Sequence, residues 1–136
     1  MKETYKSYLK EISAFIPRER IYTDEMRRLA WGTDASFYRL VPQIVVRSKT
    51  EEEVSRLLSA ARRRRLPVTF RAAGTSLSGQ SLSDSILIVA GKNWENYKIS
   101  ADAETITMQP GILGERVNPL LKPFGRIFTP DPASKN

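Results

Sequence analysis

Residues 43–71 carry the pattern that most constrains the fold of this chain, a helical segment between two short β-branched runs. A helix is predicted over residues 50–65, because Thr50 can cap it, three glutamates fill its first turn and four arginines fill its last turn. The flanking runs 43–47 and 68–71 are typical of strands. A strand, a helix and a second strand within about 30 residues form a βαβ unit, which implies parallel pairing.

The segments around this unit predict an α/β (α+β) fold, with a small parallel sheet flanked by helices and the start of a second, mixed sheet. Further helices are predicted over 4–16, from Thr23 and over 113–124, and further strands over 86–90, 94–100 and 104–109. We expect a break or a short first turn at Pro119 in the last helix. The inward faces of the helices are predicted to be Tyr5, Tyr8, Leu9 and Ile12; Met26, Leu29 and Ala30; Val54, Leu57, Leu58 and Ala61; and Leu113, Val117, Leu120 and Leu121.

The chain contains no cysteine and no histidine. This composition excludes disulfides, thiolate catalysis, Cys/His metal sites and histidine general bases within the chain. Redox chemistry would therefore need a non-covalent organic cofactor. The N-terminal residues 1–13 are too charged for a signal peptide, and no apolar run approaches the roughly 18–20 residues of a membrane span. We expect a soluble, cytoplasmic protein.

The net charge is +7, and four arginines follow one another at residues 62–65. A basic patch of this kind can bind nucleic acid. The alternative is the solvated end of a helix, where positive charge suits the helix dipole. No aromatic residue stands beside the run, although single-stranded nucleic-acid sites combine the two. We favour the helix end and expect no nucleic-acid partner.

Residues 71–81, with the sequence RAAGTSLSGQS, form a glycine- and hydroxyl-rich loop between two apolar strands. A loop at the carboxyl end of a parallel strand lies where α/β sheets bind ligands. Gly74 and Gly79 can adopt positive φ, which lets successive backbone N–H groups point into one anion-binding concavity. No acidic residue occurs from Arg71 to Ser83, and Arg71 can add positive charge. The hydroxyl donors are Thr75, Ser76, Ser78 and Ser81.

This loop lacks the Gly-Lys-Ser/Thr of a Walker loop and the GxGxxG dinucleotide fingerprint, and a surface linker is the bland alternative. Four segments nevertheless occur together: 33-TDASFYRLVPQIVVRSKTEEEVSRLL-58, 67-PVTFRAAGTSLSGQS-81, 109-QPGILGERVNPLLKPFG-125 and 130-PDPAS-134. In this order they resemble the FAD-binding domain of the vanillyl-alcohol oxidase and p-cresol methylhydroxylase (PCMH-type) flavoproteins. Within this family, the chain more specifically resembles the D-lactate dehydrogenase and glycolate oxidase branch. It covers the chain from about residue 30 onward, and the loop is its most specific part.

The resemblance implies that the loop wraps the diphosphate of FAD through backbone amides and small hydroxyls. Relatives that bind flavin covalently carry a histidine in this loop, whereas Thr75 and Ser76 stand here, which implies non-covalent FAD. It also implies a helical extension over residues 1–30 and the truncated N-terminal portion of the domain over residues 31–136. The implied cofactor-binding residues are Arg71, Ala72, Ala73, Gly74, Thr75, Ser76, Leu77, Ser78, Gly79, Gln80, Gly111 and Ser134.

A protein of this branch would oxidise a 2-hydroxy acid such as D-lactate, glycolate or 2-hydroxyglutarate and pass the electrons to an acceptor partner. The substrate domain, and the iron–sulfur cluster of some fused forms, would lie outside these residues, so the chain alone is expected to be inactive. No catalytic residue stands out, and Asp34 is expected to form an Asx-turn or a cap. The alternatives are a non-enzymatic anion- or nucleotide-binding module and a basic nucleic-acid-binding domain.

Overall fold

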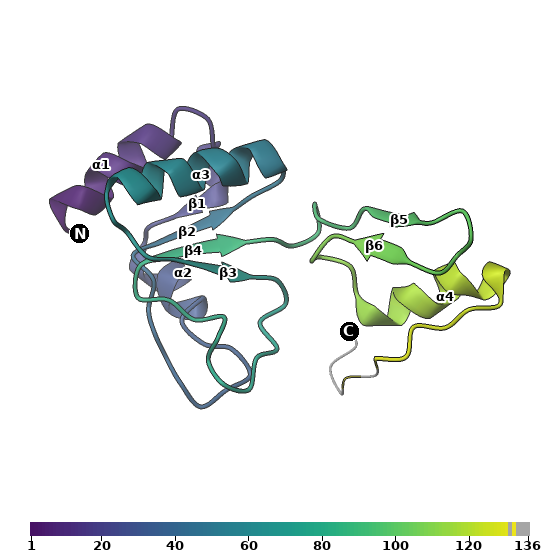
Figure 1. Cartoon of the computed structure of the whole chain (residues 1–136). Helices are drawn as coiled ribbons and strands as arrows, with labels where there is room; N and C mark the ends of the chain where they lie inside the picture. The colour runs from purple at the N-terminus through teal and green to yellow at the C-terminus, as the bar shows by residue number, and fades with distance from the viewer. Residues whose placement is uncertain (131, 133–136) are drawn as a thin grey trace.

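A four-stranded sheet lies at the centre of the first of two lobes in the computed structural model, which describes residues 1–130 and 132 (Figure 1). The strand order is β1-β2-β4-β3, in which β2, β4 and β3 are parallel and β1 is antiparallel to β2. The strands are β1 (Ile21–Tyr22), β2 (Ile44–Arg47), β3 (Val68–Arg71) and β4 (Ile86–Val89).

The predicted parallel sheet is confirmed, but the two strands of the βαβ unit are not paired with each other. β4 lies between β2 and β3 and pairs with both. All four residues of β4 are buried. A strand that is apolar throughout suits the centre of a sheet covered on both faces.

Two helices, α1 (Glu3–Ile12) and α3 (Glu51–Arg63), cover one face of the sheet (Figure 1). The core on this face contains Tyr8, Ile12, Ile16, Ile21, Ile44, Val46, Leu57, Ala60, Ala61, Ile86 and Ile88. The opposite face carries a smaller cluster of Val45, Leu87 and Val89, against which Tyr22 and Trp31 pack. Because α1 belongs to the larger core, it is packed as an integral part of this lobe.

The N-terminus of α3 confirms the predicted cap, because the Thr50 hydroxyl accepts a hydrogen bond from the N–H of Glu53 at 3.1 Å. Its predicted buried face is partly wrong. Leu58 is 38% exposed, and Ala60 is buried instead. The buried stripe is centred on Leu57, and Leu58 lies at the stripe's edge because successive residues are about 100° apart around a helix.

The helix α2 (Glu25–Ala30) corrects the prediction made from Thr23. Its cap is Asp24, which accepts the N–H of Arg27 at 3.0 Å. Met26, Leu29 and Ala30, predicted to face inward, are exposed, Met26 by 82%. The helix is only six residues long, and polar contacts hold it in place, including one from the Arg28 side chain to the Pro42 carbonyl.

The helix predicted over residues 4–16 ends at Ile12, and a turn follows it. Hydrogen bonds from the N–H groups of Phe15 and Ile16 to the carbonyl of Ile12 close this turn. Ile16 is still buried in the core. The chain therefore keeps the predicted apolar contacts with a shorter helix.

The second lobe begins after β4 and contains the antiparallel pair β5 (Tyr97–Ile99) and β6 (Ile106–Met108) and the helix α4 (Val117–Leu121) (Figure 1). Short 3-10 turns flank α4 on both sides, but α4 continues through Pro119, so the break expected there is wrong. Pro119 lies in the first turn of α4, where its missing N–H is tolerated. Val117 and Leu121 are buried, whereas Leu113 and Leu120 are half-buried. Across residues 1–130 and 132, no helix has the length and apolar character needed to cross a bilayer.

Candidate cofactor-binding site

The glycine-rich loop leaves the carboxyl end of β3, as predicted, and returns to the start of β4. Gly74 and Gly79 adopt φ of 77° and 74°, in the left-handed region that glycine tolerates. The backbone N–H groups of residues 73–77 have no hydrogen-bond acceptor among residues 1–130 and 132. A run of free N–H groups around a left-handed glycine is the arrangement that binds anions.

The second half of the loop is closed on itself by Ser76. Its hydroxyl oxygen accepts the N–H groups of Ser78 at 3.2 Å and of Gln80 at 3.1 Å. The same hydroxyl donates to the side-chain oxygen of Gln80 at 3.0 Å. The N–H groups of Ser78 and Gln80 are therefore engaged within the loop, whereas the five consecutive N–H groups of residues 73–77 have no acceptor in the described part of the chain.

Residues 31–38 contact the loop at several points, and we call these contacts the loop clamp. The N–H of Ala35 donates to the carbonyl of Gly74 at 3.1 Å. The hydroxyl of Ser81 donates to Asp34 Oδ2 at 2.9 Å. Gly79 faces the Tyr38 ring so closely that a Cβ there would lie 3.1 Å from ring atom Cδ2. These contacts hold the loop to the lobe at several points, which a slack surface linker would not show.

Asp34 forms the predicted Asx-turn, with Oδ1 accepting the Ser36 N–H at 2.9 Å and the Ser36 hydroxyl at 2.5 Å. The Ser36 hydroxyl is the main cause that holds the Asp34 pKa below its usual value. The Ser36 N–H, the Ser81 hydroxyl and the charge of Arg71 act in the same direction, against the effect of burial. Asp34 thus brings a negative charge beside a loop whose own sequence has none, and it engages the Ser81 hydroxyl that the sequence offered to an anion.

Arg71 turns its guanidinium toward residues 31–33. Its Nη1 donates to the carbonyl of Thr33 at 2.6 Å, and its Cζ lies 5.1 Å from the centre of the Trp31 ring. A Cβ on Gly74 would collide with this guanidinium, so the side chain lies directly against the loop. Burial lowers the pKa of Arg71 and Asp34 opposes that effect, while its Nε has no hydrogen-bond partner within the described part of the chain.

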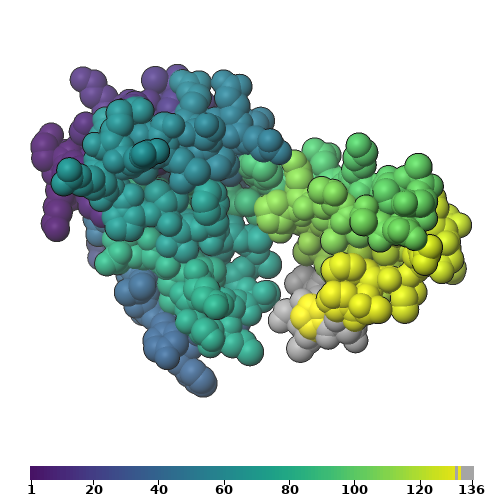
Figure 2. Space-filling view, in the orientation of Figure 1, coloured from purple at the N-terminus to yellow at the C-terminus, as the bar shows by residue number. Residues whose placement is uncertain are grey.

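A groove of about 420 Å³ separates the start of the loop from the second lobe (Figure 2). We call it the inter-lobe groove; it is lined by Ala72, Ala73, Ala90, Gly91, Lys92, Glu95, Pro110, Gly111, Ile112, Leu113 and Arg116. It brings together three predicted site residues, Ala72, Ala73 and Gly111. The free N–H groups of residues 73–77 begin at its wall.

Gly111 forms the opposite wall through close backbone packing. Its N–H donates to the carbonyl of Trp94 at 2.8 Å. A Cβ at this position would lie 2.7 Å from the Trp94 carbonyl oxygen and would collide with the carbonyl of Gly91. Only a residue without a side chain fits there, because of this internal packing, and the approach of Gly111 to a cofactor stays a prediction.

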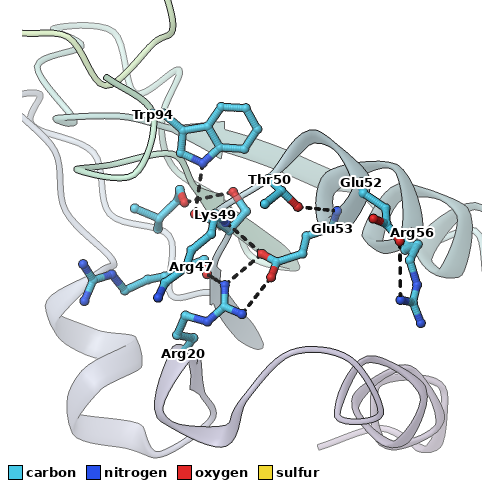
Figure 3. A network of polar contacts seen from close by, with 10 residues as sticks. Arg20, Arg47, Lys49, Thr50, Glu52, Glu53, Arg56 and Trp94 are labelled. Carbon is cyan, nitrogen blue, oxygen red and sulfur yellow. Dashed lines mark hydrogen bonds and ion pairs between the residues drawn. The ribbon is translucent and has the colours of Figure 1, made fainter. Parts of the chain in front are cut away.

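A second polar cluster, the Arg20–Glu53 network, fixes the carboxyl end of β2 (Figure 3). Two hydrogen bonds of 2.8 and 2.7 Å join Arg20 to Glu53, which also accepts the N–H of Lys49 at 2.8 Å. The hydrogen bond from Arg20 is the largest cause that lowers the Glu53 pKa. Beside this cluster, Trp94 Nε1 donates to the Ser48 carbonyl at 3.0 Å, which ties the second lobe to the first.

The structure brings most predicted site residues into one continuous loop and groove, with exceptions. Leu77 is exposed by 79%, and the Ser76 hydroxyl and Gln80 are engaged within the loop. Ser134 lies outside the described residues. Sequence reasoning missed the supporting role of residues 31–38, for which the Asx-turn at Asp34 was the only local signal. It also missed Lys92 and Trp94, which no motif marked.

The arginine run at the end of α3 is partly neutralised by α1. Arg64 pairs with Glu11 at 2.8 Å, and Arg63 pairs with the same carboxylate. The hydrogen bond from Arg64 is the largest cause that lowers the pKa of Glu11. Arg64 also donates to the hydroxyl of Ser7. These contacts support a helix end that packs on its neighbour, and they reduce the charge available to a nucleic acid.

Comparison with known proteins gives one family and a consistent fold. The sequence model of the family described as FAD binding domain matches residues 42–136. D-2-hydroxyglutarate dehydrogenase of Pseudomonas putida is 29% identical over 136 residues, covering 97% of this chain and 14% of the relative. Glycolate oxidase subunit GlcD of Escherichia coli is 32% identical over 120 residues, covering 86% of this chain and 24% of the relative.

A crystal structure of p-cresol methylhydroxylase shares the fold. Its TM-score is 0.71 at 12% identity, and the match covers 92% of this chain and 26% of the other. The likeness confirms the predicted fold class, an α/β arrangement with a parallel and an antiparallel sheet. This chain spans 14% and 24% of the two sequence relatives named above.

Proposed function

Because the chain belongs to the family of FAD-binding domains, we propose that its loop and inter-lobe groove bind FAD without a covalent bond. The observation that carries this proposal is the run of N–H groups at residues 73–77, which have no acceptor among residues 1–130 and 132. Free N–H groups in series suit the oxygens of a diphosphate. Among the described residues, Arg71 to Gln80 and Gly111 are the proposed cofactor-binding residues, and Ser134 stays a prediction.

Two closely packed glycines support the proposal beside the N–H donors. Gly74 and Gly111 stand where a side chain would collide with Arg71 or with the Gly91 carbonyl. Of the two, Gly111 lines the inter-lobe groove, and the proposal has the ligand approach its backbone there. No group of three or more His, Cys, Asp or Glu residues suited to a metal occurs in the described part of the chain.

The activity proposed for the whole protein is the FAD-linked oxidation of a 2-hydroxy acid. The support is in the names of the relatives, a D-2-hydroxyglutarate dehydrogenase and a glycolate oxidase subunit, since both named substrates are 2-hydroxy acids. FAD would accept the hydride when bound, and the residues described here would bind and orient it. An electron-acceptor partner, an iron–sulfur cluster elsewhere, a cytoplasmic location and the boundary near residue 30 stay predictions.

The test is a titration with FAD, followed by the fluorescence of Trp31 and Trp94 and by the visible spectrum of the flavin. Gly74→Ala should weaken binding about tenfold, because a non-glycine residue at positive φ costs about 1–2 kcal/mol. Gly125→Ala is the matched control, since Gly125 also has positive φ, 64°, but a Cβ there meets no atom of the described residues within 4 Å. Equal losses of affinity in the two variants would contradict the proposed role of the loop.

The same titration separates the alternatives. A non-enzymatic anion-binding module would bind ADP, FAD and inorganic diphosphate without preference for the flavin. A nucleic-acid-binding domain would bind RNA or DNA with strong salt dependence and would not bind FAD. Binding of FAD in preference to ADP, with no salt-sensitive binding to nucleic acid, is the result expected for the proposed function.

A further inference from the structure

A diphosphate bound in the inter-lobe groove carries negative charge, and a cation beside it would compensate that charge. The sequence offered Arg71 for this purpose, but its Nη1 donates to the Thr33 carbonyl and its guanidinium lies over the Trp31 ring. Backbone N–H groups carry only partial charges. The compensating cation must therefore be sought among the other residues that line the groove.

Lys92 and Arg116 are the cations that line the inter-lobe groove. Arg116 is engaged already, because its Nη1 pairs with Glu95 Oε2 at 2.8 Å. The Lys92 ammonium makes no ion pair or hydrogen bond with any residue from 1 to 130 or with residue 132. Lys92 is thus the one groove cation whose charge is uncommitted within that part of the chain.

Lys92 also stands at a suitable place in the fold. It follows β4 after Ala90 and Gly91, so it projects from the carboxyl end of the central strand of the sheet. Ala72 and Ala73, which lead into the free N–H run, line the same groove. Ligands of α/β sheets bind at this end of the strands. A lysine acts on phosphate as a compact point charge on a flexible stem.

We propose that Lys92 forms an ion pair with the diphosphate of the bound cofactor and makes the inter-lobe groove select flavin nucleotides that carry phosphate. This inference rests on the proposed function. Arg71 stays among the proposed cofactor-binding residues, and its Nη1 also holds the loop in shape through the Thr33 carbonyl. The proposal assigns a full positive charge to Lys92 and backbone hydrogen bonding to residues 73–77.

The test compares Lys92→Gln with the unaltered protein in titrations with FAD, ADP and riboflavin at several salt concentrations. We expect affinity for FAD and ADP to fall about tenfold and its salt dependence to weaken, because one charge-assisted contact is removed. Affinity for riboflavin, which has no phosphate, should stay unchanged. Lys98→Gln is the matched control, because Lys98 is an exposed lysine of the same lobe that does not line the groove.

Lys92→Arg should restore most of the FAD affinity, which an effect on folding alone would not produce. Unaltered FAD affinity and salt dependence in Lys92→Gln would overturn the inference and leave the proposed function standing. An equal loss of riboflavin affinity would also overturn it, because the defect would not concern phosphate. If the unaltered protein bound neither FAD nor ADP, the proposed function would fail, and this inference with it.

Discussion

The Arg20–Glu53 network and the loop clamp both contain an arginine and a carboxylate, but they are built differently. In the first, the guanidinium meets the carboxylate directly through two bonds, and the two side chains are only 11% and 17% exposed. In the second, Arg71 bonds to the Thr33 carbonyl, while Asp34 bonds to serine hydroxyls and a backbone N–H. The first joins elements of the core, and the second joins a loop to a neighbouring segment.

This difference suggests a division between stability and binding. Breaking an ion pair that is largely shielded from solvent leaves an uncompensated, half-buried charge, which destabilises the whole lobe. Breaking a contact of an exposed loop changes local order and leaves most of the core intact. We therefore expect variants of the Arg20–Glu53 network to lower stability and variants of the loop clamp to lower cofactor affinity.

The largest effect on stability is expected for Glu53→Ala, which should lower the free energy of unfolding by about 3 kcal/mol. The change leaves the Arg20 guanidinium without its carboxylate and the N–H of Lys49 without its acceptor. Urea denaturation followed by circular dichroism measures the loss. FAD affinity per folded molecule should stay the same, because Glu53 does not line the inter-lobe groove.

Glu52→Ala is the matched control for this variant. Glu52 lies in the same first turn of α3, is 83% exposed at its side chain and approaches Arg56 only at 4.0 Å. Exposed pairs of this kind contribute little, so the free energy of unfolding should change by less than about 0.5 kcal/mol. If Glu52→Ala and Glu53→Ala lost equal stability, the Arg20–Glu53 network would have no special role.

The next effect in size is expected for Gly111→Ala, because it should lower both stability and binding. A Cβ at this position would press on two backbone carbonyls, of Gly91 and of Trp94, and such overpacking costs about 2 kcal/mol. Denaturation and FAD titration measure the two losses. Gly91→Ala is the control for stability, since a Cβ there meets nothing within 4 Å. A stable Gly111→Ala variant would show that this wall of the groove yields easily.

The parts of the molecule that could be predicted from sequence are those set by local interactions. The cap of α3 at Thr50 and the left-handed glycines of the loop depend on neighbouring residues, and both are confirmed. The position of β4 between β2 and β3 depends on which strand is buried on both faces, and the order of strands along the chain does not reveal it. The inward face of α2 failed because a helix of six residues can rest on polar contacts alone.

The sequence predicted where the candidate site lies, but not which contacts hold its loop. The loop could be located because it follows a predicted parallel strand. Its glycines, which adopt positive φ, indicated that backbone N–H groups would be free to bind an anion. The loop clamp joins residues distant in sequence, as Ser81 contacts Asp34 and Arg71 contacts Thr33. Such pairs become visible only in the folded chain. The sequence could therefore suggest Arg71 as a ligand for phosphate, which stays a prediction, but it could not show that Nη1 bonds to Thr33.

The smallest effect on global stability is expected for Asp34→Ala, which removes the acceptor of the Ser36 N–H and of the Ser36 and Ser81 hydroxyls. Hydrogen exchange and limited proteolysis should show faster opening of residues 72–81, and FAD affinity should fall. Asp34→Asn should retain most of the protection, because its side-chain oxygen can still accept the Ser36 bonds. Unchanged proteolysis in Asp34→Ala would contradict the loop clamp.

Lowering the pH should have different effects through the two hydrogen-bonded aspartates of the first lobe, Asp34 and Asp24. The Asp34 pKa is lowered in the folded protein, so its contribution is complete above the unfolded pKa of about 3.9 and is lost as pH falls through the folded pKa. Loop protection should therefore weaken below about pH 4 in the unaltered protein, whereas Asp34→Asn should lack this acid step. Asp24→Asn is the control, because Asp24 also has a lowered pKa but caps α2. The Asp24→Asn variant should still lose loop protection below about pH 4, because the carboxylate that bonds to the loop is that of Asp34.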